Sequence, residues 1–202
     1  MEEKIKSLIK SFSIEISEDG IKKLSLFALE VLNKNKIINL ISKNDEQKII
    51  SRHIVDSIMI LRTGLIKPTD KTLLDIGSGG GFPGVCLSII YPEISITLAE
   101  KKEKKSKFLI WIKQFLKLEN IQIVNKEITG NEKQRYDIIT QRAAGKLEFL
   151  YKIAMPLLNP HGIFISWLSP EMAKKINNNP YFIYNYNLGD ERQRCISAFL
   201  KE

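Results

Sequence analysis

The segment from Leu73 to Gly84, LLDIGSGGGFPG, restricts the possible fold more than any other part of this 202-residue chain. An apolar run ends at an acid, five glycines follow within the eight residues from Gly77 to Gly84, and a helical pattern begins near Pro83. A strand, a glycine loop and a helix in this order are typical of an open α/β sheet, which binds ligands at the carboxyl ends of its strands. The segment therefore predicts an α/β fold in which a small molecule lies against bare backbone.

The chain after Lys71 supports this prediction, because short apolar runs alternate there with amphipathic helical patterns, as in a parallel sheet. We predict strands at 72–76, 95–99, 121–124, 136–140 and 161–167, and helices near 83–91, 103–118 and 146–157. The tail segments YFIYNYNL and RQRCISAFLK add two further strands. The prediction is a mostly parallel, seven-stranded sheet.

Residues 1–67 have helical rather than strand spacing of their apolar side chains. Ser17 is placed to cap a second helix, and Asn44 with Gln47 three residues later forms a capping-box pair for a third helix that ends at Gly64. We expect a helical N-terminal cap over 1–67 and a Rossmann-like domain over 68–202, forming one compact unit.

Composition narrows the class of protein. The net charge of +8 favours a polyanionic partner such as nucleic acid, with a general bias toward lysine as the alternative explanation. Cys86 and Cys195 lack the spacing of a disulfide framework or zinc site and are interpreted as core residues, and we expect no metal. No segment approaches the ~18 apolar residues of a membrane span, so we expect a cytoplasmic monomer without membrane attachment.

The ligand of the glycine loop is either a dinucleotide or another nucleoside compound. A dinucleotide fingerprint at Gly79, Gly81 and Gly84 is weak, and Asp75 lies where it would repel a pyrophosphate. The pattern Asp75, Gly77, Gly79 and Gly81 resembles instead the first motif of class I S-adenosylmethionine-dependent methyltransferases, in which nearby carboxylates help to place the cofactor's ammonium group.

Two further strand ends fit a nucleoside ligand. Glu100 closes the second strand, where an acid accepts hydrogen bonds from ribose hydroxyls, which suits NAD and S-adenosylmethionine equally. The segment from Glu127 to Thr129 follows the third strand and is expected beside the adenine.

The acceptor of a methyl group is usually determined after the fourth strand, here YDIITQRAAG. The segment has no N/D/S-P-P-aromatic turn for amino-group methylation, and neither cysteine suits the nucleophile of pyrimidine carbon-5 methylation. Guanine N7 qualifies because it carries a lone pair and no proton. Arg142 is expected in this pocket, holding the cofactor or RNA backbone, with a helix-end salt bridge as the alternative.

Two groups of side chains outside these motifs have both a functional and a structural interpretation. His53 and Asp56 lie on one helical face and either line the acceptor pocket or, as we favour, pair and pin the helical cap to the sheet. Tyr181, Tyr184 and Tyr186 either stack on bases or, more in keeping with their alternation, belong to the sheet.

Several of these segments together resemble one family, the bacterial small-subunit ribosomal RNA methyltransferase G, also called glucose-inhibited division protein B. The resemblance extends from about Asn39 to Leu158 and rests on NLIS, RHIVDS, DIGSGGGFPG, KKSKFL, KLENI and the QRA of residues 141–143. It implies a class I methyltransferase fold, S-adenosylmethionine as methyl donor, and transfer to N7 of a guanine in 16S rRNA near the decoding centre of the small ribosomal subunit. The implied cofactor contacts are Gly77, Phe82, Ile128, Thr129 and Arg142.

The chain departs from this family at two positions, both on the substrate side. ISWLSP at 165–170 lacks the Lys-Gly that commonly follows the fifth strand, and Gln141 replaces a serine. Three other functions stay open: an NAD-binding oxidoreductase, a methyltransferase of a small molecule or protein, and a non-catalytic ribosome-binding factor.

Overall fold

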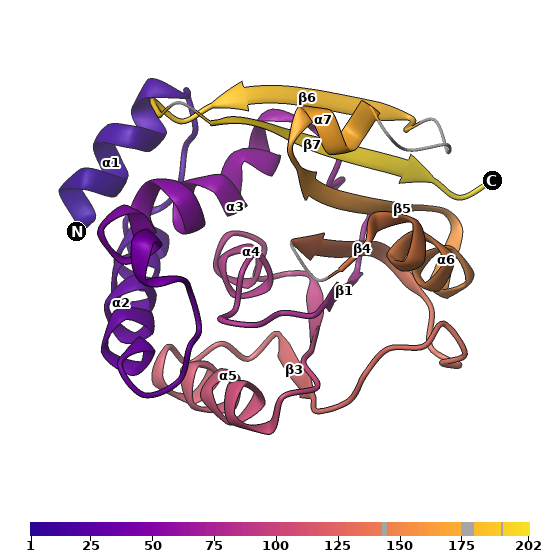
Figure 1. Ribbon diagram of the computed structural model, residues 1–202, viewed down its shortest axis with the longest axis horizontal. Helices are drawn as coiled ribbons and strands as arrows, with labels where there is room; N and C mark the ends of the chain where they lie inside the picture. The colour runs from indigo at the N-terminus through magenta and orange to yellow at the C-terminus, as the bar shows by residue number, and fades with distance from the viewer. Residues whose placement is uncertain (143–144, 175–179, 191) are drawn as a thin grey trace.

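The computed structural model describes residues 1–142, 145–174, 180–190 and 192–202 (Figure 1). Within them one sheet has seven strands in the order β3-β2-β1-β4-β5-β7-β6. The strands are β1 (Thr72–Ile76), β2 (Ser95–Ala99), β3 (Ile121–Val124), β4 (Tyr136–Arg142), β5 (Leu158–Leu168), β6 (Phe182–Asn187) and β7 (Gln193–Leu200). Strand β7 alone runs opposite to the other six strands, which confirms the predicted mostly parallel sheet.

Helices cover both faces of the sheet. They are α1 (Glu2–Ser11), α2 (Glu18–Asn35), α3 (Asp56–Ile58), α4 (Gly84–Ile90), α5 (Glu103–Phe115), α6 (Leu147–Leu157) and α7 (Pro170–Lys174), with η1 (Lys43–Lys48), η2 (Ile50–Val55) and η3 (Met59–Arg62). Figure 1 shows α2, α4 and α5 on one side of the strands and α6 on the other. Each connection between parallel strands therefore returns over a face of the sheet, and the carboxyl ends of the strands meet along one edge.

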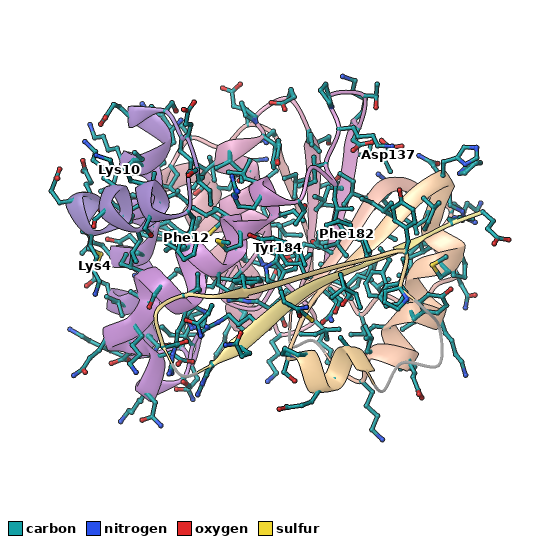
Figure 2. All side chains as sticks on the ribbon, turned by 90° about the horizontal axis from the view of Figure 1, so that it is seen from above. Lys4, Lys10, Phe12, Asp137, Phe182 and Tyr184 are labelled. Carbon is teal, nitrogen blue, oxygen red and sulfur yellow. The ribbon has the colours of Figure 1, made fainter. Side chains whose placement is uncertain are left out.

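Alternation along the strands divides the core into two hydrophobic clusters, because successive side chains point to opposite faces. Leu73 joins the first cluster, with side chains of α1, α2, α4 and α5, whereas Leu74 joins the second, with side chains of α6. Phe12 after α1 and Tyr184 of β6, both labelled in Figure 2, pack against the first cluster. The N-terminal helices and the sheet thus share one cluster of buried side chains.

The N-terminal segment confirms one predicted cap and corrects another. The side chain of Ser17 accepts a hydrogen bond from the N–H of Gly20 at 3.1 Å, as expected. The predicted third helix is present, because residues 43–62 are helical throughout and Gly64 follows with a φ angle of 65°. The predicted cap is wrong, since Asn44 lies inside the 3-10 helix η1, and the helix continues as the π-helix η2, then α3 and η3. The wide π turn carries Arg52 and His53, whose long-range bonds, described below, prevail over local helix propensity.

Both cysteines have the environment expected of core residues. Cys86 and Cys195 are buried free thiols. Burial raises the pKa of Cys86 to about 12, so this thiol stays protonated and is a poor nucleophile. None of the helices within the described ranges has the length and apolarity needed to cross a membrane.

Candidate active site

A cleft of about 1000 Å³ opens at the carboxyl ends of the strands. Its walls come from the glycine loop after β1, the end of β2, the π-helix η2, the end of β4, and the segments around β5, α7 and β7. Six of the predicted site residues line it: Gly77, Gly79, Phe82, Glu100, Ile128 and Arg142. Three others do not, namely Asp75, Gly81 and Thr129.

The first part of the glycine loop is tied to the end of β2. The N–H groups of Gly77 and Ser78 both donate to the carbonyl of Ala99, at 2.9 and 3.0 Å. Gly77 and Gly79 have φ angles of 70° and 57°, in the left-handed region that favours glycine. The loop therefore presents backbone to the cleft in a conformation that other residues rarely adopt.

The later glycines of the loop serve packing. A Cβ at Gly81 would lie 2.9 Å from the ring of Phe27, and one at Gly84 would lie 2.3 Å from the side chain of Leu98. Both positions face neighbouring buried side chains, so the assignment of Gly81 to the ligand is not supported by its place in the fold. These glycines let α4 approach the sheet closely.

Asp75 lies behind the loop, in contrast to the expectation that its carboxylate contacts a ligand. It is 1% exposed and accepts hydrogen bonds from the hydroxyl of Thr140 at 2.9 Å and from the N–H of Gly84 at 3.3 Å. Burial raises the pKa of this carboxyl to about 6. Asp75 thus joins β1, β4 and the start of α4, and it acts on the cleft by holding the loop in place.

Glu100 occupies the position expected of a ribose-binding acid. It is buried at the wall of the cleft, where one carboxylate oxygen accepts the N–H of Gly79 at 2.9 Å and the other accepts the N–H of Lys102 at 2.7 Å. A carboxylate oxygen can accept two hydrogen bonds, so capacity for a diol remains. Ile128 adds an apolar wall, whereas the N–H of Thr129 donates to Glu132 at 3.2 Å.

Arg142, at the end of β4, is held on several sides. One guanidinium nitrogen donates to the carboxylate of Asp56 at 3.0 Å and to the carbonyl of Arg52 at 3.1 Å, and the other donates to Nδ1 of His53 at 2.7 Å. The guanidinium also lies 5.1 Å from the ring centre of Phe82. Arg142 therefore lines the cleft and forms a salt bridge with Asp56, and its contact with the cofactor or RNA stays a prediction.

His53 is a neutral hydrogen-bond acceptor in this arrangement. Burial and then the charge of Arg142 lower its pKa to about 3. Because Nδ1 accepts from Arg142, the ring proton resides on Nε2, which lies 3.5 Å from Asp45. The expected pairing with Asp56 is replaced by a shared contact with Arg142. His53 and Asp56 bind the N-terminal segment to β4 through Arg142, as the favoured structural interpretation predicts. Both residues also line the cleft, and their place in an acceptor pocket stays a prediction.

Asp56 connects segments that are distant in the sequence. Its carboxylate accepts the hydroxyl of Tyr186 at 2.7 Å and lies 3.5 Å from Nε of Arg194, and its carbonyl accepts Nε1–H of Trp167 at 2.8 Å. Burial, reinforced by the nearby carboxylate, raises the pKa of Tyr186, so the phenol remains a donor. Sequence reasoning missed Trp167 and Arg194, because neither belongs to a recognisable motif.

The tyrosines of the tail have structural positions. Tyr186 is buried and bonded to Asp56, and Tyr184 stacks on it with ring centres 5.8 Å apart. Tyr181 is 67% exposed and does not line the cleft. The interpretation of these residues as sheet side chains is confirmed for Tyr184 and Tyr186, which lie in β6.

The two departures on the substrate side also lie at the cleft. Gln141 lines it and its amide donates to the hydroxyl of Ser166 on β5. Leu168, Ser169 and Pro170 line it where Lys-Gly was expected. Ala143, the last residue of the QRA segment, lies outside the described residues. Across the residues that are described, no three His, Cys, Asp or Glu side chains are grouped so as to hold a metal ion.

Comparison with known structures gives the fold class. The chain superimposes on precorrin-6y C5,15-methyltransferase from Geobacter metallireducens with a TM-score of 0.55 and 15% identity, covering 81% of this chain and 91% of that one. It also superimposes on the T. thermophilus 16S rRNA N2 G1207 methyltransferase in complex with AdoMet and guanosine, with a TM-score of 0.55 and 14% identity over 74% of this chain and 42% of that one. The fold is that of class I S-adenosylmethionine-dependent methyltransferases.

Sequence comparison identifies the family. Two ribosomal RNA small subunit methyltransferase G proteins are similar to the chain. The one from Caldanaerobacter subterraneus subsp. tengcongensis is 33% identical over 161 residues, 77% of this chain and 67% of its own length. The one from Desulfitobacterium hafniense is 35% identical over 159 residues, 76% of this chain and 65% of its own length. Since residues 20–181 also match the family as a whole, the chain belongs to the rRNA small subunit methyltransferase G family.

Proposed function

We propose that the protein transfers a methyl group from S-adenosylmethionine to N7 of a guanine in 16S rRNA, near the decoding centre of the small subunit. The observation that carries this proposal is a single cleft lined by Gly77, Glu100 and Ile128 and also by Arg142, which lies over the ring of Phe82. Family membership supplies the class of substrate, because relatives that match most of the chain are named for small-subunit rRNA.

The residues present fit the cofactor. Glu100 offers carboxylate oxygens to the ribose hydroxyls, and Ile128 offers an apolar surface to the adenine. The backbone from Gly77 to Phe82 would contact the methionine part, and Asp75 holds the two ends of this loop through Thr140 and Gly84. When bound, the cofactor supplies a methyl group on a positively charged sulfur.

Methylation of guanine N7 requires no acid or base from the protein. The bond from sulfur to the methyl carbon breaks, the bond from that carbon to N7 forms, and the positive charge passes from the sulfonium to the base without release of a proton. Catalysis then rests on alignment, which supplies roughly 7–11 kcal/mol in favourable cases. This agrees with a site in which His53 is uncharged and occupied in positioning Arg142 rather than serving as a proton acceptor.

Basic side chains near the cleft suit an RNA substrate. Lys101, Lys102, Lys105 and Lys126 line it beside the glycine loop. Lys101, Lys102 and Lys126 are exposed and Lys105 is half-buried. Lysines that contact phosphate release counterions on binding. We place the reaction in the cytoplasm, with the protein acting as a monomer on the small subunit or its rRNA, and the helical segment 1–67 acting as a cap on the 68–202 domain.

The test offers labelled S-adenosylmethionine together with small subunits, assembly intermediates or naked 16S rRNA. Borohydride and aniline then cleave the RNA at 7-methylguanine and locate the product. We expect label in 16S rRNA and a single strong cleavage; label without cleavage would reject N7. Transfer should weaken as salt rises, whereas a flat salt response would attribute the +8 charge to composition alone.

The same experiment separates the other candidate functions. An oxidoreductase would bind NAD and not S-adenosylmethionine in a calorimetric titration. A methyltransferase of a small molecule or protein would bind S-adenosylmethionine but leave rRNA unlabelled. A non-catalytic binding factor would associate with small subunits and transfer no methyl group.

A further inference from the structure

Two exposed apolar side chains stand out in the lining of the cleft. Ten large hydrophobic residues within the described ranges are exposed, but of these only Phe149 and Met172 line the cleft, with 60% and 48% of their surface accessible. Neither belongs to either hydrophobic cluster, whereas Leu150, the next residue after Phe149, is buried in the second cluster. Helix α6 thus anchors itself through Leu150 and presents Phe149 to the cleft.

Both side chains belong to helices that follow neighbouring strands of the sheet. Phe149 is in the first turn of α6, which follows β4, and Met172 is in α7, which follows β5. Strands β4 and β5 are parallel neighbours, so both helices begin at the edge where the cleft opens (Figure 1). Among the proposed cofactor contacts, the glycine loop, Glu100 and Ile128 follow β1, β2 and β3, whereas Arg142 ends β4.

The chemistry of this part of the cleft matches an unstacked nucleobase. A base removed from an RNA stack loses its neighbours, and aromatic or other apolar side chains replace them. The cleft, at about 1000 Å³, is at the upper end of the ~300–1000 Å³ range of ligand pockets, so there is space for a base beside the cofactor. Arg192, which is exposed and also lines the cleft, adds a cation suited to the phosphate of the same nucleotide.

We propose that Phe149 binds the target guanine by stacking on its face, with Met172 completing the apolar contact. This assignment rests on the proposed function, because it names the substrate contact of the same reaction. Stacking leaves the edge of the base, and therefore N7, free to face the methyl donor. It also makes Phe149 a substrate-binding residue that does not contact the cofactor.

The test compares Phe149→Ala, Phe149→Tyr and the control Tyr181→Ala. Tyr181 is an aromatic side chain of similar exposure that does not line the cleft. Methyl transfer to small subunits gives kcat and KM, calorimetry gives the affinity for S-adenosylmethionine, and thermal unfolding verifies the fold. We expect Phe149→Ala to lower kcat/KM about 10- to 100-fold with cofactor affinity unchanged, as stacking on a base implies. Phe149→Tyr and Tyr181→Ala should both remain close to wild type.

Each remaining outcome overturns the assignment in a recognisable way. Unchanged kcat/KM in Phe149→Ala would show that the ring does not contact the base. Loss of cofactor affinity in that variant would place the ring at the cofactor instead, and failure of Phe149→Tyr to restore transfer would exclude simple stacking. If the wild-type protein binds S-adenosylmethionine but leaves rRNA unmethylated, the proposed function itself fails, which is a different result from a loss confined to Phe149→Ala.

Discussion

Replacing Asp56 by alanine removes a carboxylate that side chains of three strands share. The carboxylate is 6% exposed and accepts hydrogen bonds from Arg142 of β4 and from the hydroxyl of Tyr186 of β6, at 3.0 and 2.7 Å. Arg194 of β7 lies 3.5 Å from it. The substitution leaves two guanidinium groups and a phenol facing a small apolar side chain.

The expected loss of unfolding free energy in Asp56→Ala follows from the burial of this ion pair. Removing one partner of a buried ion pair costs ~3–5 kcal/mol, since the remaining charge is neither paired nor hydrated. The free energy of unfolding of a domain of this kind is about 5–15 kcal/mol, so the variant should be markedly less stable. Tyr186→Phe removes a single hydrogen bond to a charged group and should cost about 1.5–3 kcal/mol. Asp19→Ala breaks the exposed pair with Lys23 and should cost less than about 1 kcal/mol.

Urea unfolding followed by circular dichroism measures all three variants and the double variant of Asp56 and Tyr186. Because the two residues are in direct contact, their effects should not add, and the interaction energy should be at least about 1 kcal/mol. The m-value shows whether compactness has changed. A loss below about 1 kcal/mol in Asp56→Ala with an unchanged m-value would refute the reasoning, because the buried pair would then contribute no more than the exposed one.

Three further predictions concern pH, charge geometry and packing. His53 is protonated near pH 6.5 in the unfolded chain, whereas the folded protein keeps it neutral down to about pH 3. Its contribution to the free energy of unfolding is therefore complete above pH 6.5. This contribution is lost as the pH falls, by up to ~1.4 kcal/mol per pH unit. The raised pKa of Asp75 makes the free energy of unfolding change with pH in the opposite direction between pH 3.8 and about 6. The contribution of His53 is therefore measured as the difference in unfolding free energy between wild type and His53→Gln at each pH. If the two curves of unfolding free energy against pH are parallel, His53 is not neutral in the folded protein. Arg142→Lys keeps the charge but cannot reach three acceptors, and we expect methyl transfer to fall about 100-fold; full activity would remove Arg142 from the site. Gly84→Ala places a Cβ 2.3 Å from Leu98 and should lower the free energy of unfolding by about 1–3 kcal/mol, whereas an unchanged urea midpoint would show that α4 shifts freely.

Local sequence patterns were sufficient to predict the bounds of most strands of the sheet. Short apolar runs place β1, β2 and β3 with the predicted bounds. Strands β4 and β5 are longer than expected, because ladder hydrogen bonds extend strands past their apolar residues. The helix expected after Asn44 is present, but its cap and its geometry differ from the prediction. A sequence with helical spacing forms η1 and the π-helix η2 instead, where Arg52 and His53 make long-range contacts.

Some features of the candidate site were predictable from the sequence, whereas others depend on tertiary packing. The glycine loop, Glu100 and Ile128 follow consecutive strands, and the topology of an α/β sheet brings the carboxyl ends of its strands together. Their order along the sequence therefore predicted that these residues would line one cleft. The position of Asp75 behind the loop, and the separation of Gly77 from Gly84 in role, depend on which side chains fill the space around α4.

The connection of Asp56 to Trp167 and Tyr186 joins residues 111 and 130 positions apart. No periodicity or spacing encodes such a pair, because the contact exists only once the sheet has formed and the N-terminal segment lies across its edge. Phe149 is a similar case: in sequence it is one more apolar residue of an amphipathic helix, and its exposure in the cleft follows from the direction in which α6 packs. Patterns of neighbouring residues determine where the strands and loops lie and which strand ends meet at the cleft. Burial and long-range hydrogen bonds, which exist only in the folded protein, determine which side chains are fixed at those strand ends.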